Sequence, residues 1–259
     1  VGNLLYIAPD VDCPGTHGGS THVSEAVGSL STLCSHVYLL CKHNAGQLYY
    51  ERQKSVTILR LPIPSFSAVR VAWYFLSSFF VALFLIIFRN VSVIYERGRI
   101  FGGGGVLAGA LLGKKTIYEL IEPYLAVPVL LGDIHKTSFL YKIMRAWHRF
   151  VTNRASLITV THASALEDIS HHRVLFIHTG ANPQRFKPQK SSAFLQKKYS
   201  LTPGKTLLYI GSFSPWHACE QLLHAIARLV KTDKQVRLLM IGHGQKYTEC
   251  VRLAERLNI

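Results

Sequence analysis

The chain of 259 residues is long enough for one large domain or two modest ones, and its 49% of apolar residues can supply a core. Charged residues make up only 17%, which excludes a wholly disordered chain. The 29 Lys and Arg outnumber the 14 Asp and Glu, for a net charge of +15. This excess is spread along the chain and favours anionic partners, namely phosphorylated ligands, nucleic acid or acidic lipid surfaces.

Expected strands and helices alternate along the whole sequence. Apolar runs typical of strands occupy residues 3–8, 36–41, 55–61, 91–95, 115–118, 156–161, 174–178, 206–211 and 236–242. Helical spacing fills most of the intervening segments, most clearly at 17–33, 220–230 and 246–257. Such alternation predicts βαβ units and therefore an α/β fold built on parallel sheets.

A change of composition divides the chain. Residues 182–190 hold two prolines and three bases, as is typical of a hinge. We predict two Rossmann-like parallel-sheet domains, 1–185 and 186–259. The second is expected to be incomplete, because two visible strands cannot bury a doubly wound sheet. The chain starts without a signal-peptide pattern and stops after a helical pattern, so we expect a fragment.

The five cysteines are scattered and form no C-x-x-C pair. This pattern argues against a disulfide scaffold and a zinc site, and it favours a reducing compartment. We therefore expect a cytoplasmic protein without a metal site.

Two segments have features of membrane contact. Residues 71–88 are uncharged and bracketed by Arg70 and Arg89, at the lower edge of a spanning length. A crossing would separate two strands of one expected sheet, so a crossover helix, buried or resting on a membrane surface, is favoured over a transmembrane helix. Residues 134–154 place three bases on one helical face, which suits either an anionic lipid surface or a solvated face.

Glycine-rich turns are candidate anion sites. Gly18 and Gly19 follow the first strand and open the first helix, where backbone N–H groups can approach an anion, although a tight turn without a ligand explains them too. Residues 103–108 match G-x-G-x-x-A, with Glu122 roughly 20 residues further on as in a dinucleotide site. These glycines do not follow the strand directly, so close packing before a helix is favoured.

Charged residues at strand ends are the candidate reactive groups. In open α/β sheets ligands bind at the carboxyl ends of parallel strands, where Arg97 and Glu119 are expected. An ion pair of Arg97 with Glu96 or Glu119 is the structural alternative. Glu119 and Glu122 lie three residues apart and could orient sugar hydroxyls or act as a base.

The second expected domain has two glycine turns in register. Gly211, Ser212 and His217 follow one strand, and Gly242 and Gly244 follow the next. Glycines after neighbouring strands create a crevice for a nucleotide and its phosphates.

Together, in order and spacing, these segments resemble the retaining glycosyltransferases of family 4, which have the two-domain GT-B fold. The similar segments cover nearly the whole chain: the Gly18-Gly19 turn, 93–97 (VIYER), 179–182 (TGAN) with Phe186, 209–217 (YIGSFSPWH) and 241–244 (IGHG). The resemblance implies a UDP- or GDP-linked sugar as donor substrate, held mainly by the C-terminal domain. It further implies transfer with retention and no metal or other cofactor.

The resemblance also implies roles for single residues. Gly18 and Gly19 lie near the donor diphosphate, and His217 stands where many members have a phosphate-binding Lys. The expected acceptor, on the N-terminal domain, is a glycan or a lipid-linked molecule. With the charge excess, this suggests polysaccharide biosynthesis by an enzyme peripheral to the inner membrane face.

The sequence departs from the family pattern at several places. Glu119 replaces a catalytic His, Ser212 and Phe213 are uncharged where a base is usual, and Ala218 replaces Gly. The E-x7-E element is expected beyond residue 259. A non-catalytic, glycosyltransferase-like binding module is therefore the alternative function. No recognition helix, zinc spacing or aromatic RNA-binding strand accompanies the positive charge, so we expect no nucleic-acid partner.

Overall fold

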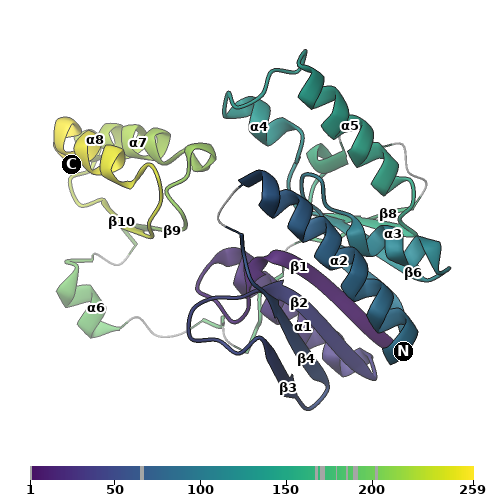
Figure 1. Ribbon diagram of the computed structural model, residues 1–259. Helices are drawn as coiled ribbons and strands as arrows, with labels where there is room; N and C mark the ends of the chain where they lie inside the picture. The colour runs from purple at the N-terminus through teal and green to yellow at the C-terminus, as the bar shows by residue number, and fades with distance from the viewer. Residues whose placement is uncertain are drawn as a thin grey trace. The chain divides into compact units, whose positions relative to one another are not determined.

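The computed structural model describes residues 2–64, 67–166, 169, 173–178, 180–184, 186–188, 192–201 and 204–259 (Figure 1). The chain forms two compact units, Val1–Asn182 and Pro183–Ile259, each with its own sheet.

The described part of unit 1 is built on an eight-stranded sheet in the order β3-β4-β2-β1-β5-β6-β7-β8. The strands are β1 (Asn3–Asp12), β2 (His36–Lys42), β3 (Tyr50–Gln53), β4 (Val56–Leu61), β5 (Val91–Arg97), β6 (Lys115–Leu120), β7 (Leu157–Val160) and β8 (Val174–Phe176). All neighbours are parallel except β3 and β4. The expected parallel sheet is therefore confirmed, with an antiparallel edge hairpin added.

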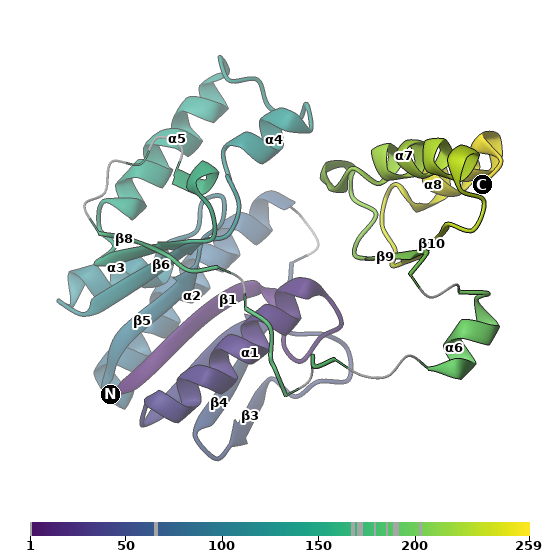
Figure 2. The ribbon, with the colours of Figure 1, turned by 180° about the vertical axis from the view of Figure 1, so that it is seen from behind.

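Helices cover both faces of this sheet. The helix α1 (Gly18–Leu33) lies on one face, and α2 (Ser67–Arg89) and α3 (Gly104–Leu111) lie on the other (Figures 1 and 2). The helix α5 (Phe139–Thr152) packs beside them through an edge-to-face contact of Phe75 with Trp147, and a short α4 (Ala126–Leu130) precedes it. A 3-10 turn, η1 (Ala163–Leu166), follows β7.

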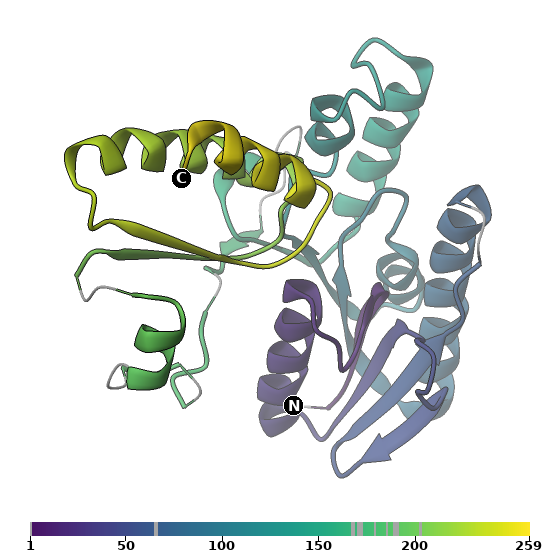
Figure 3. The ribbon, with the colours of Figure 1, turned by 90° about the vertical axis from the view of Figure 1, so that its left-hand side faces the viewer.

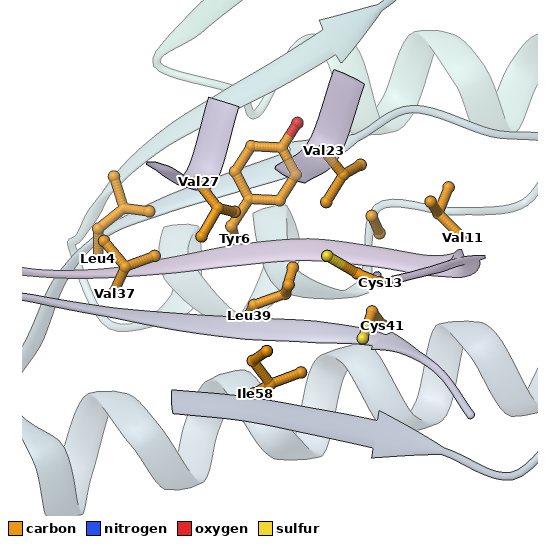
Figure 4. Close-up of a cluster of buried hydrophobic side chains, with 11 residues drawn as sticks. Leu4, Tyr6, Val11, Cys13, Val23, Val27, Val37, Leu39, Cys41 and Ile58 are labelled. Atoms are coloured by element: carbon orange, nitrogen blue, oxygen red, sulfur yellow. The ribbon is translucent and has the colours of Figure 1, made fainter. Parts of the chain in front are cut away.

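The core beneath α1 explains why the central strands read as continuous apolar runs. Val23 and Val27 of α1 pack on the Tyr6 ring and on Leu39 of β2, all at most 5% exposed (Figure 4). Burying each such side chain contributes about 1.5–3 kcal/mol. A second cluster fills the α2 side of the same strands, so β1 and β2 are buried on both faces.

The helix α2 is apolar on both of its sides. Its inner side buries Tyr74, Ser78, Ala82, Leu85 and Ile86 against the sheet and α3. Its outer side exposes large apolar side chains over its whole length: Val69, Trp73, Leu76, Phe80, Phe84, Ile87 and Phe88. By length and composition Val69–Arg89 could cross a membrane, but it connects β4 and β5 of one sheet and packs on that sheet as a crossover helix.

Unit 2 contains α6 (Ala193–Lys198), β9 (Thr206–Ile210), α7 (Cys219–Thr232), β10 (Arg237–Ile241) and α8 (Tyr247–Leu257). The strands β9 and β10 pair in parallel, with α7 and α8 on the same face (Figure 3). On the other face Leu208 and Ile210 are 58% and 71% exposed. The restart of the α/β alternation after residue 190 is thus confirmed, with two strands in the described part.

Candidate functional site

Three polar side chains surround Glu119 at the carboxyl edge of the unit 1 sheet. Glu119 is buried, with 7% of its surface exposed. The Tyr95 hydroxyl donates to Oε1 at 3.0 Å, and the Tyr6 hydroxyl donates to Oε2 at 3.3 Å. The Nε2 atom of His22, on α1, lies 3.0 Å from Oε1. Both carboxylate oxygens are therefore held by side chains from other elements.

The strand register explains this meeting. Tyr6 of β1 pairs with Tyr95 of β5, and Tyr95 pairs with Ile117, two residues before Glu119 in β6. Because side chains alternate along a strand, all three polar groups project to the face that α1 covers. The Tyr6 and Tyr95 rings stack with centroids 4.8 Å apart. Glu119 lies within β6, which extends two residues beyond the strand expected at 115–118.

Burial keeps the two tyrosines protonated. Burial, followed by the charge of Glu119, raises the pKa of Tyr6 and of Tyr95 well above the ordinary 10.0. Both hydroxyls therefore remain hydrogen-bond donors at any physiological pH. They orient Glu119, which in turn fixes His22, whose side chain is 29% exposed. A carboxylate–imidazole pair of this kind can hold one tautomer and leave the second ring nitrogen to accept a proton.

Gly18, Gly19 and Arg97 also meet at this edge. The helix α1 begins at Gly18, with no acidic residue in its first turn and no side-chain cap from His17. A Cβ added to Gly19 would lie 3.0 Å from Nη1 of Arg97. Arg97 is half-buried and forms neither of the expected ion pairs, nor any hydrogen bond to a described residue. A half-buried guanidinium beside a helix N-terminus is suited to bind an anion.

The turn before α1 is closed by polar contacts that the sequence did not reveal. Ser20 donates to Oδ1 of Asp12 at 2.6 Å, and Asn44 donates to Oδ2 at 2.8 Å. Burial alone would raise the Asp12 pKa, but the Ser20 hydrogen bond, a hydrogen bond from its own backbone N–H and the charge of Lys42 leave it below its ordinary value. A Cβ on Gly15 would lie 2.5 Å from the Ser20 hydroxyl. Gly15 is thus explained by packing alone.

The glycine-rich segment before α3 holds an internal carboxylate. The backbone N–H groups of Gly103 and Val106 donate to Oε1 and Oε2 of Glu96, each at 2.8 Å. A Cβ on Gly104 would lie 2.3 Å from the Phe75 carbonyl oxygen. Close packing, the favoured interpretation of this motif, accounts for these glycines. The anion position of a dinucleotide site is filled by Glu96, whose pKa burial raises to about 7 against these hydrogen bonds.

In unit 2, the two glycine turns pack against each other. The N–H of Phe213 donates to the His243 carbonyl at 2.8 Å, and a Cβ on Gly242 would lie 1.8 Å from the Gly211 carbonyl oxygen. Ser212 and exposed His217 are hydrogen-bonded through Oγ and Nδ1 at 2.9 Å.

A 3-10 turn, η2 (Pro215–His217), leads into α7. These contacts bring together the five candidate residues of unit 2, namely Gly211, Ser212, His217, Gly242 and Gly244.

Other candidates lie apart from these clusters. Glu122 is exposed in the loop after β6, so its environment differs from that of buried Glu119. In the 179–182 segment, Thr179 lies outside the described residues, and Asn182 donates to Glu25 of α1 at 3.0 Å. Among the described residues no three His, Cys, Asp or Glu side chains are grouped as metal ligands.

Sequence reasoning overlooked His22, Tyr6 and Tyr95. The one available signal was that His22 lies four residues before Ala26 on the apolar stripe of the first helix, and so faces the sheet.

No protein-family model matches the sequence, and no curated protein matches it significantly. Solved structures do. The sucrose-phosphate synthase of Thermosynechococcus elongatus matches with a TM-score of 0.70 at 16% identity, over 100% of this chain and 68% of that one. Anabaena Alr3699/HepE, in complex with UDP and glucose, matches with a TM-score of 0.69 at 14% identity, over 99% of this chain and 66% of that one.

WaaG, a glycosyltransferase involved in lipopolysaccharide biosynthesis, gives 0.69 at 15% identity, over 98% of this chain and 67% of its own. The chain thus spans about two thirds of the length of these structures, which is consistent with the expected incomplete second domain. The comparisons confirm the predicted fold class: an α/β chain of the GT-B type.

Proposed function

We propose that the protein is a glycosyltransferase that transfers a sugar from a UDP- or GDP-linked donor to an acceptor with retention of configuration, as in family 4. The observation that carries this is the half-buried Arg97 guanidinium, without a hydrogen bond or ion pair to a described residue, beside Gly19 in the first turn of α1, which begins at Gly18. On a fold shared with a structure that holds UDP, this position fits the donor phosphates. The developing charge of a leaving diphosphate requires such a partner.

In the proposed mechanism His22 touches the substrate and Glu119 positions it. With Nε2 directed at Glu119, the Nδ1 lone pair of His22 accepts a hydrogen bond from a sugar hydroxyl. The imidazole that family members carry at the strand end is thereby supplied from α1. We assign exposed Glu122 to orienting a further hydroxyl.

In unit 2 we propose that the glycine turns bind the nucleoside part of the donor. The N–H groups at Gly242 and Gly244 are backbone donors that need no charged side chain, whereas the Gly211 N–H donates to the Ile241 carbonyl and holds the turn in place. His217, held by Ser212, takes the place of a basic residue.

Nucleotide binding tests the proposal. Calorimetric titration of the 259-residue chain with UDP and GDP should show binding that weakens about tenfold in Arg97→Gln, since a charge-assisted hydrogen bond contributes about 1.5–3 kcal/mol. Arg89→Gln makes the same charge change at the amino-terminal edge of the sheet and should bind normally. Equal affinities in all three proteins would refute the assignment of Arg97. Binding without sugar transfer by the full-length protein would instead indicate a non-catalytic module.

We further propose that unit 1 is peripheral to the cytoplasmic face of an anionic membrane. The exposed apolar side of α2 is continuous over the helix, and a groove of about 630 Å3 between α2 and β3–β4 adds Arg52 and Arg89 to its rim. The neighbouring α5 exposes Lys142 and Arg149. Large exposed apolar surfaces rimmed by bases are typical of membrane contact.

Vesicle sedimentation tests the membrane proposal. The chain should sediment with vesicles containing phosphatidylserine and less with phosphatidylcholine alone, and Phe84→Ser should weaken both. Equal, negligible sedimentation with both vesicles would remove the proposal.

A further inference from the structure

A second basic site lies at the same sheet edge, on the side covered by α2. It is a cavity of about 610 Å3 lined by loops that follow the parallel strands and by the start of α2. Its polar lining consists of Asp10, Lys42, His43, Arg70, Tyr74 and Arg99. These residues come from β1, the end of β2, the segment after β5, and α2. Ligands of open α/β sheets bind at such carboxyl ends.

The cavity has more positive than negative charge. The lining holds three cationic side chains, Lys42, Arg70 and Arg99, and one carboxylate, that of Asp10, while Lys42 also interacts with Asp12 outside the lining. The ion pair of Arg99 Nη1 with Asp10 spans 3.2 Å, and the guanidinium lies over the Tyr74 ring at 4.3 Å from its centroid. Arg99 Nη1 is buried and makes no hydrogen bond to a described residue. The lining therefore carries an excess of positive charge that a bound anion would balance.

A phosphate monoester fits this requirement. It carries a charge of about −1.5 to −2 and three acceptor oxygens, which match several converging cations better than a single carboxylate does. The cavity also has room for the group that carries the phosphate, since small-molecule sites are typically about 300–1,000 Å3. We propose that this cavity binds the phosphate of the acceptor, which makes the acceptor of the proposed transfer a phosphorylated molecule.

This site is distinct from the one assigned to the donor. Arg97 pairs in register with Glu119 on the α1 side of the sheet, whereas Arg99 contacts Tyr74 of α2 on the opposite side. Two anion sites on the two sides of one sheet edge suit a reaction in which donor and acceptor both carry phosphate.

The helix α2 connects the cavity with the exposed apolar surface. Trp73 is 36% exposed, and its Nε1 donates to the carbonyl of Pro62, a lining residue, at 2.8 Å. Trp73 thus lies between Arg70 and Tyr74 in sequence but on the outer side of the helix. A lipid phosphate could place its head in the cavity and its chain along α2, whereas a soluble sugar phosphate would use the cavity alone.

Phosphate binding by the 259-residue chain tests the proposal independently of catalysis. Calorimetry with glucose 6-phosphate and hexyl phosphate, each compared with glucose or hexanol, measures the soluble arm. Sedimentation with phosphatidylcholine vesicles carrying phosphatidic acid, compared with an equal fraction of phosphatidylserine, measures the lipid arm. In either arm Lys42→Gln and Arg70→Gln should weaken phosphate binding about tenfold. Lys115→Gln, with the same charge change at the amino-terminal edge, should not.

The outcomes distinguish a soluble from a lipid phosphate, and the cavity assignment from the proposed glycosyltransferase function. Preference for glucose 6-phosphate without preference for phosphatidic acid identifies a soluble acceptor, and the reverse identifies a lipid acceptor. No binding of any phosphate probe, or an equal loss in Lys115→Gln, overturns the cavity assignment. UDP affinity, measured in the same variants, should be unchanged. If the wild-type chain binds the phosphate probes but not UDP, the proposed function is refuted and the cavity assignment is supported.

Discussion

The buried carboxyl of Glu96 should make the stability of unit 1 depend on pH. Burial raises its pKa from 4.5 to about 7, although the N–H groups of Gly103 and Val106 favour the charged form. A raised folded-state pKa contributes stability that is complete below the unfolded-state value and is lost as pH rises through the folded-state value. The loss therefore falls between about pH 4.5 and 7.

The expected magnitude follows from the two pKa values. One pKa unit corresponds to about 1.4 kcal/mol, so the free energy of unfolding should lose roughly 3 kcal/mol across the interval because of this group. The Glu96→Gln variant has no proton to titrate at this position. The free energy of unfolding of the wild type minus that of the variant should therefore fall by that amount from pH 4.5 to 7. Urea unfolding at several pH values measures it.

The exposed Glu122 provides the control, because Glu122→Gln removes a carboxyl of the same unit that is not buried. Its difference from wild type should not vary across this interval. If the Glu96→Gln difference is also constant to within about 0.5 kcal/mol, Glu96 stays ionised, and hydrogen bonding by the α3 N-terminus has outweighed burial.

Three further substitutions test the packing and the Glu119 cluster. Gly104→Ala should destabilise by about 2 kcal/mol or more, because its methyl group meets the Phe75 carbonyl of α2; urea unfolding unchanged from wild type would refute the close approach. Ala218→Gly should stabilise by about 0.5–1 kcal/mol, because Ala218 has φ +53° at the start of α7; a lower Tm would contradict this. Tyr95→Phe should cost about 1–1.5 kcal/mol through the lost bond to Glu119, and a neutral result by urea unfolding would show that the bond is not formed.

Local sequence patterns predicted most of the strands, because strands of a parallel sheet are buried on both faces and therefore appear as short apolar runs between helical segments. They missed β3 (Tyr50–Gln53), which has the sequence YERQ. This short edge strand has three exposed residues and no alternation of apolar side chains, so nothing in its composition distinguishes it from a loop. Boundaries moved for a related reason: β1 continues to Asp12 and β6 to Leu120, where pairing with a neighbour extends the strand past the apolar run.

The sequence by itself predicted which polar residues lie at the carboxyl edge of the unit 1 sheet. Parallel strands all end on one side, so residues after them, such as Gly19, Arg97 and Glu119, are brought together whatever the details of packing. The partners of these residues could not be read in this way. His22 and Tyr6 lie 97 and 113 positions from Glu119. Tyr6 meets Glu119 only when β1, β5 and β6 pair, and His22 only when α1 docks on this sheet.

The Gly103–Val106 turn also depends on tertiary structure. Its glycine spacing suggests a dinucleotide site, but its backbone N–H groups donate to the Glu96 carboxylate instead. A local pattern specifies which backbone groups can bind an anion, and only long-range packing decides which anion reaches them.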